Sequence, residues 1–277
     1  MAARETFGVR LAEAIEVRGP LCVGLDPSAA TLAAWGLDDS ADGARSLALT
    51  TIEAVAETAA AVKAQVAFFE RFAAAGFAAL ERVVEVAREA GILLIADAKR
   101  GDIGSTNEGY AQAWAGEDSP LRADALTLHP YLGVASLAPL LAVARRSGTG
   151  ALVLAATSNP EGRPVQAAVF EGRSVEAGVC AAVAALNAVE GWGSVGVVVG
   201  ATRAPLGFDL ASLGGPILVP GVGAQGAGPR EVAAVAAGCS RASVLASVSR
   251  GVLAAGPSRR ALRQAAERWR DDLAEVL

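Results

Sequence analysis

The segment Ile92-Leu-Leu-Ile-Ala-Asp97-Ala-Lys99-Arg-Gly-Asp102-Ile-Gly-Ser-Thr106 joins a short apolar run directly to a group of charged residues. A short, continuous apolar run is typical of a strand that is buried on both faces. In a barrel of parallel strands, the active site lies at the carboxyl ends of the strands. The segment therefore predicts a buried strand that carries ionisable side chains into such a site.

Seven other short apolar runs alternate with longer helix-like stretches. The eight runs cover residues 21–26, 61–65, 92–97, 125–129, 151–156, 195–200, 216–221 and 243–248. The helix-like stretches include 69–90, 135–146, 175–190, 230–237 and 258–277, and an extra N-terminal helix is predicted over 6–17. This alternation predicts the α/β class, and eight strands fit a closed (β/α)8 barrel, or TIM barrel. A doubly wound sheet is the alternative, because periodicity alone does not show closure.

The sequence contains no Pro/Ser-rich linker and no abrupt change of composition, so residues 1–277 are predicted to form one domain. The longest stretch of turn-forming residues after a strand is 158–170. In a barrel this stretch overhangs the C-terminal face. It is therefore predicted either to close over the site as a lid or to be an ordinary surface loop.

Composition narrows the range of partners. The net charge is -5 at pH 7 and the basic residues are not clustered, which argues against nucleic acid or an anionic membrane and favours a small ligand. Charges and glycines interrupt every apolar run well before the roughly 18 residues that a membrane span needs. The first residues lack the features of a secretory signal, so we expect a cytoplasmic enzyme.

Cysteine and histidine are too sparse to predict a structural site. Cys22, Cys180 and Cys239 are widely spaced, and His129 is the only histidine in the sequence. Neither a disulfide framework nor a Cys/His zinc site is predicted. His129 ends an apolar run and is predicted to be a packed or turn-associated residue rather than a catalyst.

Lysine is the scarce basic residue, since only Lys63 and Lys99 occur among 24 lysines and arginines. Arginine stays protonated at any working pH, whereas the pKa of a lysine can shift and its ammonium can give up a proton. Lys99 is therefore a candidate proton donor. The alternative is a genomic preference for arginine that spared two lysines by chance.

Charged residues end three of the predicted strands. Asp97 and Lys99 are two residues apart, so their side chains are expected on one face of the strand. Asp26 ends the first run and Lys63 lies toward the end of the second. Together the four residues form an array of opposed charges, of a kind more common where it perturbs reactivity than where it stabilises. Asp102 lies beyond the strand and is expected either to face the same pocket or to reach a neighbouring subunit. An ordinary salt-bridge cluster in a loop is the alternative.

The residues after this charged group suggest the start of a helix. Ser105 and Glu108 have the spacing of a capping box. In such a box the serine hydroxyl accepts a backbone N–H of the first helical turn. Ser105 is therefore predicted to cap a helix that follows it.

A glycine-rich segment, 220–229, follows the seventh predicted strand, and Arg250 follows the eighth. Barrels commonly bind phosphate between these two loops, through backbone N–H groups and a charge-assisted side chain. Gln225 and Arg250 are the candidate contacts. The same glycines spell G-x-G-x-x-G, but a dinucleotide fold also needs an acidic residue about 20 positions further on. None lies between Glu231 and Glu267, so a dinucleotide site is not predicted.

The segment 94–106 resembles, position by position, the signature of the orotidine 5'-phosphate decarboxylase family. The resemblance extends along most of the chain, since Leu25-Asp26-Pro27, Lys63, Thr157-Ser158-Asn159-Pro160, 220–226 and Ser249-Arg250-Gly251 follow in the expected order. It is closest to the longer bacterial subfamily, type 2, which has Thr-Ser-Asn-Pro after strand five. The resemblance implies a TIM-barrel homodimer with shared active sites. It also implies conversion of orotidine 5'-phosphate to UMP and CO2 in pyrimidine biosynthesis, without a metal or an organic cofactor.

The resemblance also implies roles for residues around the reacting part of the substrate. Lys99 would protonate C6 of the pyrimidine as CO2 leaves, and Asp97 would lie beside the substrate carboxylate. Lys63 and Asp26 would contact the ribose hydroxyls and hold the charged array. Ser158 would hydrogen-bond the pyrimidine.

Two further groups of residues receive roles by the same resemblance. Asp102, Ile103 and Thr106 would come from the partner subunit and complete its site. Gln225 and Arg250 would bind the substrate phosphate.

Two other functions remain open on the sequence. A phosphosugar decarboxylase or aldolase of the same barrel superfamily shares Asp-x-Lys-x-x-Asp but uses Mg²⁺, which an acidic residue near the end of strand two helps to bind. Lys63 stands there and would repel the cation. A non-catalytic barrel that binds a nucleotide phosphate would need Gln225 and Arg250 but would have no need of Asp97 and Lys99.

Overall fold

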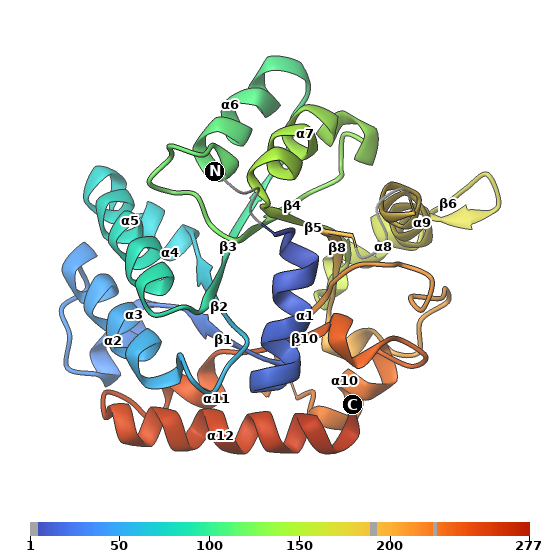
Figure 1. The fold of residues 1–277 in the computed structure, drawn as a ribbon. Coiled ribbons are helices and arrows are strands. Elements are labelled where there is room, and N and C mark those ends of the chain that lie inside the picture. Colours follow the sequence, from blue (N-terminus) through green and yellow to red (C-terminus); the bar gives the residue numbers. More distant parts are fainter. Residues whose placement is uncertain (1–4, 189–192, 224–225) are drawn as a thin grey trace.

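The protein is described by a computed structural model over residues 5–188, 193–223 and 226–277. In this part of the chain, eight parallel strands close into a barrel in the order β1-β10-β9-β8-β5-β4-β3-β2 (Figure 1). The barrel strands are β1 (Leu21–Leu25), β2 (Ala61–Gln65), β3 (Leu93–Arg100), β4 (Ala125–Leu128), β5 (Gly150–Ala156), β8 (Val195–Val199), β9 (Ile217–Val222) and β10 (Val244–Val248). The predicted TIM barrel is confirmed. The doubly wound alternative is wrong, because the first strand pairs with the last, with Leu21 opposite Ala246.

Helices surround the barrel. The longer ones are α1 (Phe7–Arg18), α3 (Ala41–Val55), α5 (Ala73–Glu89), α6 (Gly104–Ala115), α7 (Ala138–Ser147), α9 (Val175–Asn187), α10 (Pro229–Val235) and α12 (Arg259–Val276). Four short helices directly follow strands and therefore stand at the C-terminal rim: α2 (Ala29–Ala34), α4 (Ala67–Glu70), α8 (Arg163–Gln166) and α11 (Arg250–Leu253). Several helices begin at a serine whose hydroxyl accepts a backbone N–H three residues on, namely Ser28, Ser40, Ser174 and Ser258.

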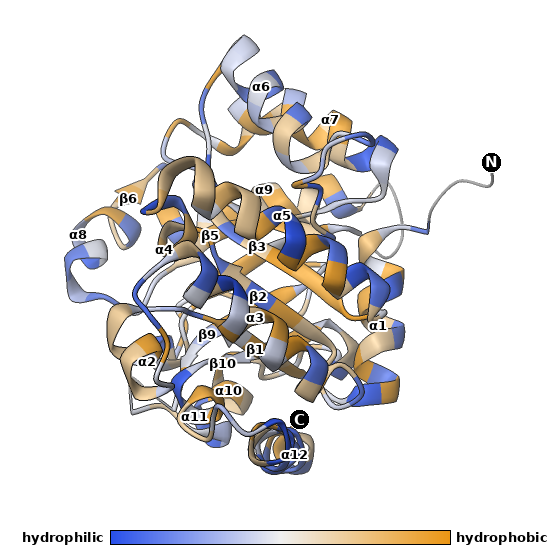
Figure 2. Cartoon of the chain, turned by 90° about the vertical axis from the view of Figure 1, so that its left-hand side faces the viewer, coloured by the Kyte–Doolittle hydropathy of each residue, from blue (hydrophilic) through white to orange (hydrophobic). Residues whose placement is uncertain are grey.

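The extra N-terminal helix α1 closes the amino-terminal end of the barrel. Its apolar face, which includes Phe7 and Leu11, joins inward-facing residues of the strands in one buried cluster. Phe7 fits because β5 begins with Gly150, where an added Cβ would lie 2.1 Å from the Phe7 ring. Figure 2 places α1 at one end of the molecule and α8 and β6 (Val169–Phe170) at the other. Helix α1 therefore covers the end of the barrel opposite to α8 and β6.

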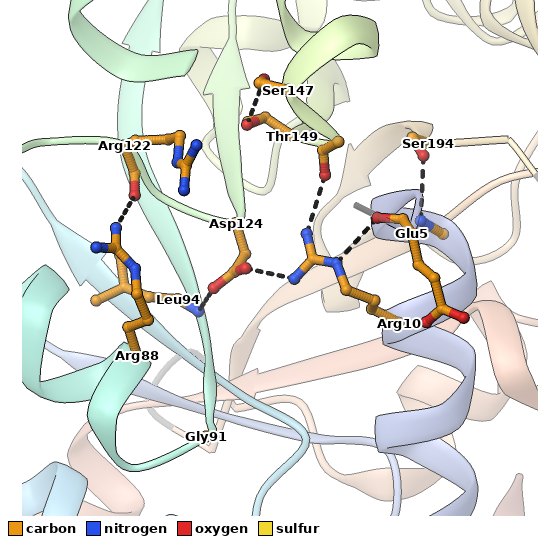
Figure 3. Close-up of polar contacts among 12 residues, drawn as sticks. Glu5, Arg10, Arg88, Gly91, Leu94, Arg122, Asp124, Ser147, Thr149 and Ser194 are labelled. Atoms are coloured by element: carbon orange, nitrogen blue, oxygen red, sulfur yellow. Dashed lines mark hydrogen bonds and ion pairs between the residues drawn. The ribbon is translucent and has the colours of Figure 1, made fainter. Parts of the chain in front are cut away.

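A polar network also fixes α1 to the strands (Figure 3). The Asp124 carboxylate accepts the Leu94 N–H at 2.9 Å and forms an ion pair with Arg10. The Arg10 guanidinium donates a second hydrogen bond to the Gly148 carbonyl at 2.9 Å. Arg10 thereby links the helix to the segments that begin β4 and β5.

Two predicted elements differ in detail. The predicted helix 69–90 is divided into α4 and α5, and Ala73, where α5 begins, has a φ of 50°. Gly76 allows this turn because an added Cβ would lie 1.8 Å from the Phe69 carbonyl oxygen. The stretch 158–170 holds α8 and strand β6, which pairs with β7 (Arg173–Ser174) in a short antiparallel hairpin. Among the described residues, every helix is too short or too polar to span a membrane.

Candidate active site

A β-bulge at the end of β3 shapes the candidate site. Ala96 pairs with Leu126 of β4, but the next pair is Arg100 with Leu128, so four steps along β3 match two along β4. Lys99 lies inside this bulge and has a φ of 48°, in the left-handed region that residues other than glycine rarely adopt. The strand thus runs further than the predicted 92–97, and Lys99 is placed by a bulge rather than by regular alternation.

The two lysines of the sequence both bind the Asp97 carboxylate. Lys63 Nζ lies 2.8 Å from Asp97 Oδ2, and Lys99 Nζ lies 2.5 Å from Asp97 Oδ1. The side chains of Lys63 and Asp97 are only 8% and 11% exposed, whereas that of Lys99 is 44% exposed. Lys99 is therefore the more exposed of the two ammonium groups, and Lys63 is the more buried.

The charges of this array control its protonation. Burial alone would raise the pKa of Asp97, but the charges of Lys63 and Lys99 outweigh burial and hold that pKa well below its usual range. Burial would lower the pKa of Lys63, but the charges of Asp97 and Asp26 hold it above its ordinary value. Asp97 is thus an anion and Lys63 a cation throughout the neutral range.

Thr127 and Gln65 also belong to the array, although the sequence analysis missed them. The Thr127 hydroxyl donates to Asp97 Oδ1 at 2.8 Å and accepts the Lys99 N–H at 3.0 Å. Gln65 accepts from Lys99 Nζ at 3.4 Å. The available signal was a polar residue inside the apolar run 125–129, together with Gln65 two residues after Lys63.

A cavity of about 420 Å³ opens beside the array. Lys63 and Asp97 line it, together with the ends of β9 and β10 and with Arg250, which follows β10. Lys99 is not among the lining residues. Asp26 also lines the cavity, and its buried Oδ1 atom has no hydrogen-bond partner among the residues that the structure describes. Because buried polar atoms are normally paired, this oxygen indicates a donor supplied by a ligand or by water.

The structure brings together only some of the predicted ligand contacts. Arg250 is the first residue of α11 and lines the cavity. Ser158 follows β5 and packs against Gly200, where an added Cβ would lie 2.9 Å from the Ser158 nitrogen. Ser158 is not among the residues that line this cavity. Gln225 lies outside the described residues.

The residues expected to serve a partner subunit lie at the start of α6. Ile103 and Thr106 are exposed, Ile103 at 62%, and the Asp102 carboxylate accepts the Ile103 N–H at 2.8 Å. The predicted cap at Ser105 is wrong, because the N-cap of α6 is Ile103, two residues earlier, and the helix begins at Gly104. Asn107 organises this turn instead, since its Oδ1 accepts the Asp102 N–H at 3.0 Å.

The three cysteines and the histidine are widely spaced in the sequence. The three cysteines are free, and burial raises the pKa of the Cys22 thiol to about 12. His129 is half-buried, and its N–H donates to the Arg100 carbonyl at 3.0 Å, which ties the end of β4 to the end of β3. Within the described residues, no group of three or more His, Cys, Asp or Glu side chains is placed to hold a metal ion.

Comparison with known proteins decides the family. A sequence model described as the orotidine 5'-phosphate decarboxylase / HUMPS family matches residues 19–265. The chain belongs to the orotidine 5'-phosphate decarboxylase family. A relative named orotidine 5'-phosphate decarboxylase, from Streptomyces coelicolor, is 52% identical over 267 residues and covers 96% of both chains. One of the same name from Salinispora arenicola is 50% identical over 95% of both.

Solved structures extend this likeness to the fold. A crystal structure from Streptomyces avermitilis has a TM-score of 0.94 and 51% identity, over 99% of this chain and 96% of that chain. The structure of Leishmania donovani OMP decarboxylase has a TM-score of 0.77 and 31% identity, over 98% of both chains. The orotidine 5'-phosphate decarboxylase family resemblance inferred from the segment 94–106 is therefore confirmed.

Proposed function

We propose that the protein decarboxylates orotidine 5'-phosphate to UMP and CO2, as a carboxy-lyase of pyrimidine biosynthesis. The observation that carries the proposal is the array in which Lys63 and Lys99 both bind Asp97 at the mouth of the cavity. Family membership and the names of relatives at about 50% identity support this substrate. The proposal takes residues 1–277 as one cytoplasmic barrel domain.

Lys99 supplies the positive charge and the proton that the decarboxylation needs at C6. When the bond between C6 and the carboxylate breaks, its electron pair stays on C6, and a proton must arrive there. The Lys99 ammonium stabilises this negative charge as it develops and then donates the proton to C6. Lys99 recovers its proton from solvent, to which its side chain is 44% exposed.

Asp97 has two tasks in this mechanism. It holds Lys99 and Lys63 in place, and it lies beside the substrate carboxylate. Two like charges about 4 Å apart repel by about 4 kcal/mol in the effective dielectric of a protein surface. That repulsion is relieved as neutral CO2 leaves. The step needs no metal or organic cofactor, because the proton comes from Lys99 and no electrons are exchanged with another group.

The remaining contacts bind and orient the substrate. The unpartnered Asp26 Oδ1 suits a ribose hydroxyl as donor, together with Lys63. Arg250 and Gln225 bind the phosphate, and Ser158 contacts the pyrimidine. Binding energy from the phosphate, which is remote from C6, closes the stretch 158–170 over the site.

The site is completed by a second copy of the chain. We propose a homodimer in which Asp102, Ile103 and Thr106 of each subunit reach into the partner's cavity. The exposure of Ile103 and Thr106 at the start of α6, just beyond β3, supports this arrangement.

The decisive experiment follows the loss of absorbance of orotidine 5'-phosphate with purified protein, with and without EDTA, alongside Lys99→Ala. Turnover that ignores EDTA and collapses in the variant is expected. Turnover that requires Mg²⁺ would support the phosphosugar relatives. Binding without turnover, retained in Lys99→Ala, would support a nucleotide-binding barrel.

A mixing experiment tests the shared site. Lys99→Ala and Asp102→Ala are each expected to be inactive. A hybrid dimer has one site that carries both changes and one site that carries neither, so mixing the two proteins should restore activity. Failure of mixed dimers to regain activity would contradict the shared site.

A further inference from the structure

We propose that Thr127 is a positioning residue that sets the orientation of the Asp97 carboxylate and the backbone of Lys99. This inference rests on the proposed function, because it concerns the proton that Lys99 delivers. Thr127 lies in β4, is 1% exposed and lies below the cavity surface. It therefore acts through its neighbours and makes no contact with the substrate itself.

The bulge in β3 explains why a side chain is needed at this place. Thr127 is the single β4 residue between Leu126 and Leu128, and these pair with Ala96 and Arg100 across the bulge. The Lys99 N–H consequently has no regular strand partner. A backbone N–H in a barrel wall needs an acceptor, and the Thr127 hydroxyl supplies it at 3.0 Å.

The direction of the hydrogen bond between Thr127 and Asp97 follows from which atoms can donate and which can only accept. The hydroxyl has one proton, and Lys99 already donates to its oxygen. Ionised Asp97 only accepts, so the Thr127 proton points to Asp97 Oδ1, 2.8 Å away. The same Oδ1 accepts from Lys99 Nζ, and Oδ2 accepts from Lys63. One hydroxyl thus fixes the carboxylate plane and the left-handed turn that carries the proton donor.

The chain also contains a threonine whose hydroxyl has a different task. Thr51 is fully buried in α3, and its hydroxyl donates to the Leu47 carbonyl at 2.8 Å within the helix. Thr51→Val and Thr127→Val are the same chemical change at two buried positions. The first therefore controls for loss of stability when a buried hydroxyl is removed.

Two measurements separate positioning from a general structural role. The first is steady-state kinetics on orotidine 5'-phosphate with Thr127→Val, Thr127→Ser and Thr51→Val. A misplaced catalytic group can lower the rate on the order of 100-fold, so we expect a kcat loss of that order in Thr127→Val, with KM nearly unchanged. Thr127→Ser keeps the hydroxyl and should recover most of kcat, and Thr51→Val should match the wild type.

The second measurement uses the scarcity of lysine. Protein labelled with [ε-¹³C]lysine gives two side-chain signals, because the chain has only Lys63 and Lys99, and Lys99→Ala assigns them. We expect the Lys99 signal to move in Thr127→Val and to keep its position in Thr127→Ser and Thr51→Val. This readout does not depend on turnover, so it decides the role of Thr127 even if the wild type fails to decarboxylate the substrate.

Clear results would overturn the proposal. An unchanged kcat in Thr127→Val, or a rise in KM alone, would mean that the hydroxyl does not place the proton donor. An equal loss in Thr127→Ser would assign the effect to the methyl group. A Lys99 signal that stays in place in Thr127→Val would contradict the geometric argument directly.

Discussion

The two ends of the barrel each hold an aspartate bound to basic side chains, but the two clusters are built differently. At the amino-terminal end, Asp124 binds both Arg10 and the Leu94 N–H (Figure 3), and α1 packs on the strands through its apolar face. At the carboxyl end, Asp97 holds Lys63 and Lys99 beside an open cavity.

The two clusters differ in how many of their polar groups remain available to a ligand. The Arg10 guanidinium donates hydrogen bonds to the Asp124 carboxylate and to the Gly148 and Glu5 carbonyls. These bonds attach α1 to the neighbouring segments. At the carboxyl end, Asp26 Oδ1 has no partner within the described part of the chain, and Lys99 is 44% exposed. The covered end therefore serves the stability of the barrel, and the open end keeps polar groups available to a ligand.

The largest expected effect is on activity at the open end. Lys99→Ala should lower kcat by on the order of 10⁴-fold, because general-acid catalysis and the stabilising charge are lost together. Lys99→Arg keeps the charge but cannot give up a proton, so it should fail similarly. Thermal unfolding of both variants should stay close to that of the wild type, since this side chain is 44% exposed. If these variants lost stability as well as activity, the open end could not be assigned to catalysis and the covered end to stability.

The next effect is on stability at the covered end. Phe7→Ala removes a fully buried ring from the helix that closes the barrel, which typically costs about 3–5 kcal/mol in the free energy of unfolding. Denaturant unfolding measures this loss, and the activity per folded molecule should remain. Val17→Ala on the exposed side of the same helix is the matched control. Equal losses in the two variants would show that α1 does not close the barrel as described.

The pH dependence sharpens the comparison at the open end. The lowered pKa of Asp97 gives stability that is present above the ordinary value of about 3.9 and is lost as pH falls through the folded-state pKa. The raised pKa of Lys63 gives stability that is present below about 10.4 and is lost as pH rises through its folded-state pKa. The coupling between them should therefore stay constant from about pH 5 to about pH 9 and shrink in stronger acid.

A double-mutant cycle with Lys63→Met and Asp97→Asn measures this coupling. Lys63→Met takes one of two ammonium partners from Asp97, and Asp97→Asn takes the ion-pair partner from buried Lys63. Breaking a buried ion pair typically costs about 3–5 kcal/mol, and the double change should cost less than the sum of the single changes. A coupling that varies between pH 5 and pH 9 would contradict the assignment of charges.

The smallest expected effect concerns the hairpin at the rim. Phe170 is 72% exposed, so Phe170→Ser should change the free energy of unfolding by less than about 0.5 kcal/mol. If the stretch 158–170 closes over the substrate, KM for orotidine 5'-phosphate should rise while stability is kept. An unchanged KM would favour an ordinary surface loop.

The sequence predicted the barrel because each strand is a short apolar run, and this pattern depends on local composition. It also predicted Asp97, Lys63 and Lys99 as neighbours, because the ends of parallel strands meet at one rim. It did not predict the bulge in β3, since the left-handed turn at Lys99 depends on a hydroxyl from the next strand.

The missed residues share a physical reason. Thr127 lies within an apolar run, and a strand-forming threonine carries no local sign that its hydroxyl binds a carboxylate 30 positions away in sequence. The cap at Ser105 failed because Asn107 satisfies the Asp102 N–H and also donates to the Ser136 carbonyl at 2.7 Å. Tertiary hydrogen bonds thus decided the details that local patterns left open.

The most direct test of the account is the position of deuterium in the product. Wild-type protein with orotidine 5'-phosphate in D2O should give UMP that carries deuterium at C6, as read by proton NMR, and Lys99→Ala should give almost none in the same time. A wild type that forms no UMP, or a Lys99→Ala variant that forms it at the wild-type rate, would contradict the claim that this array decarboxylates the substrate.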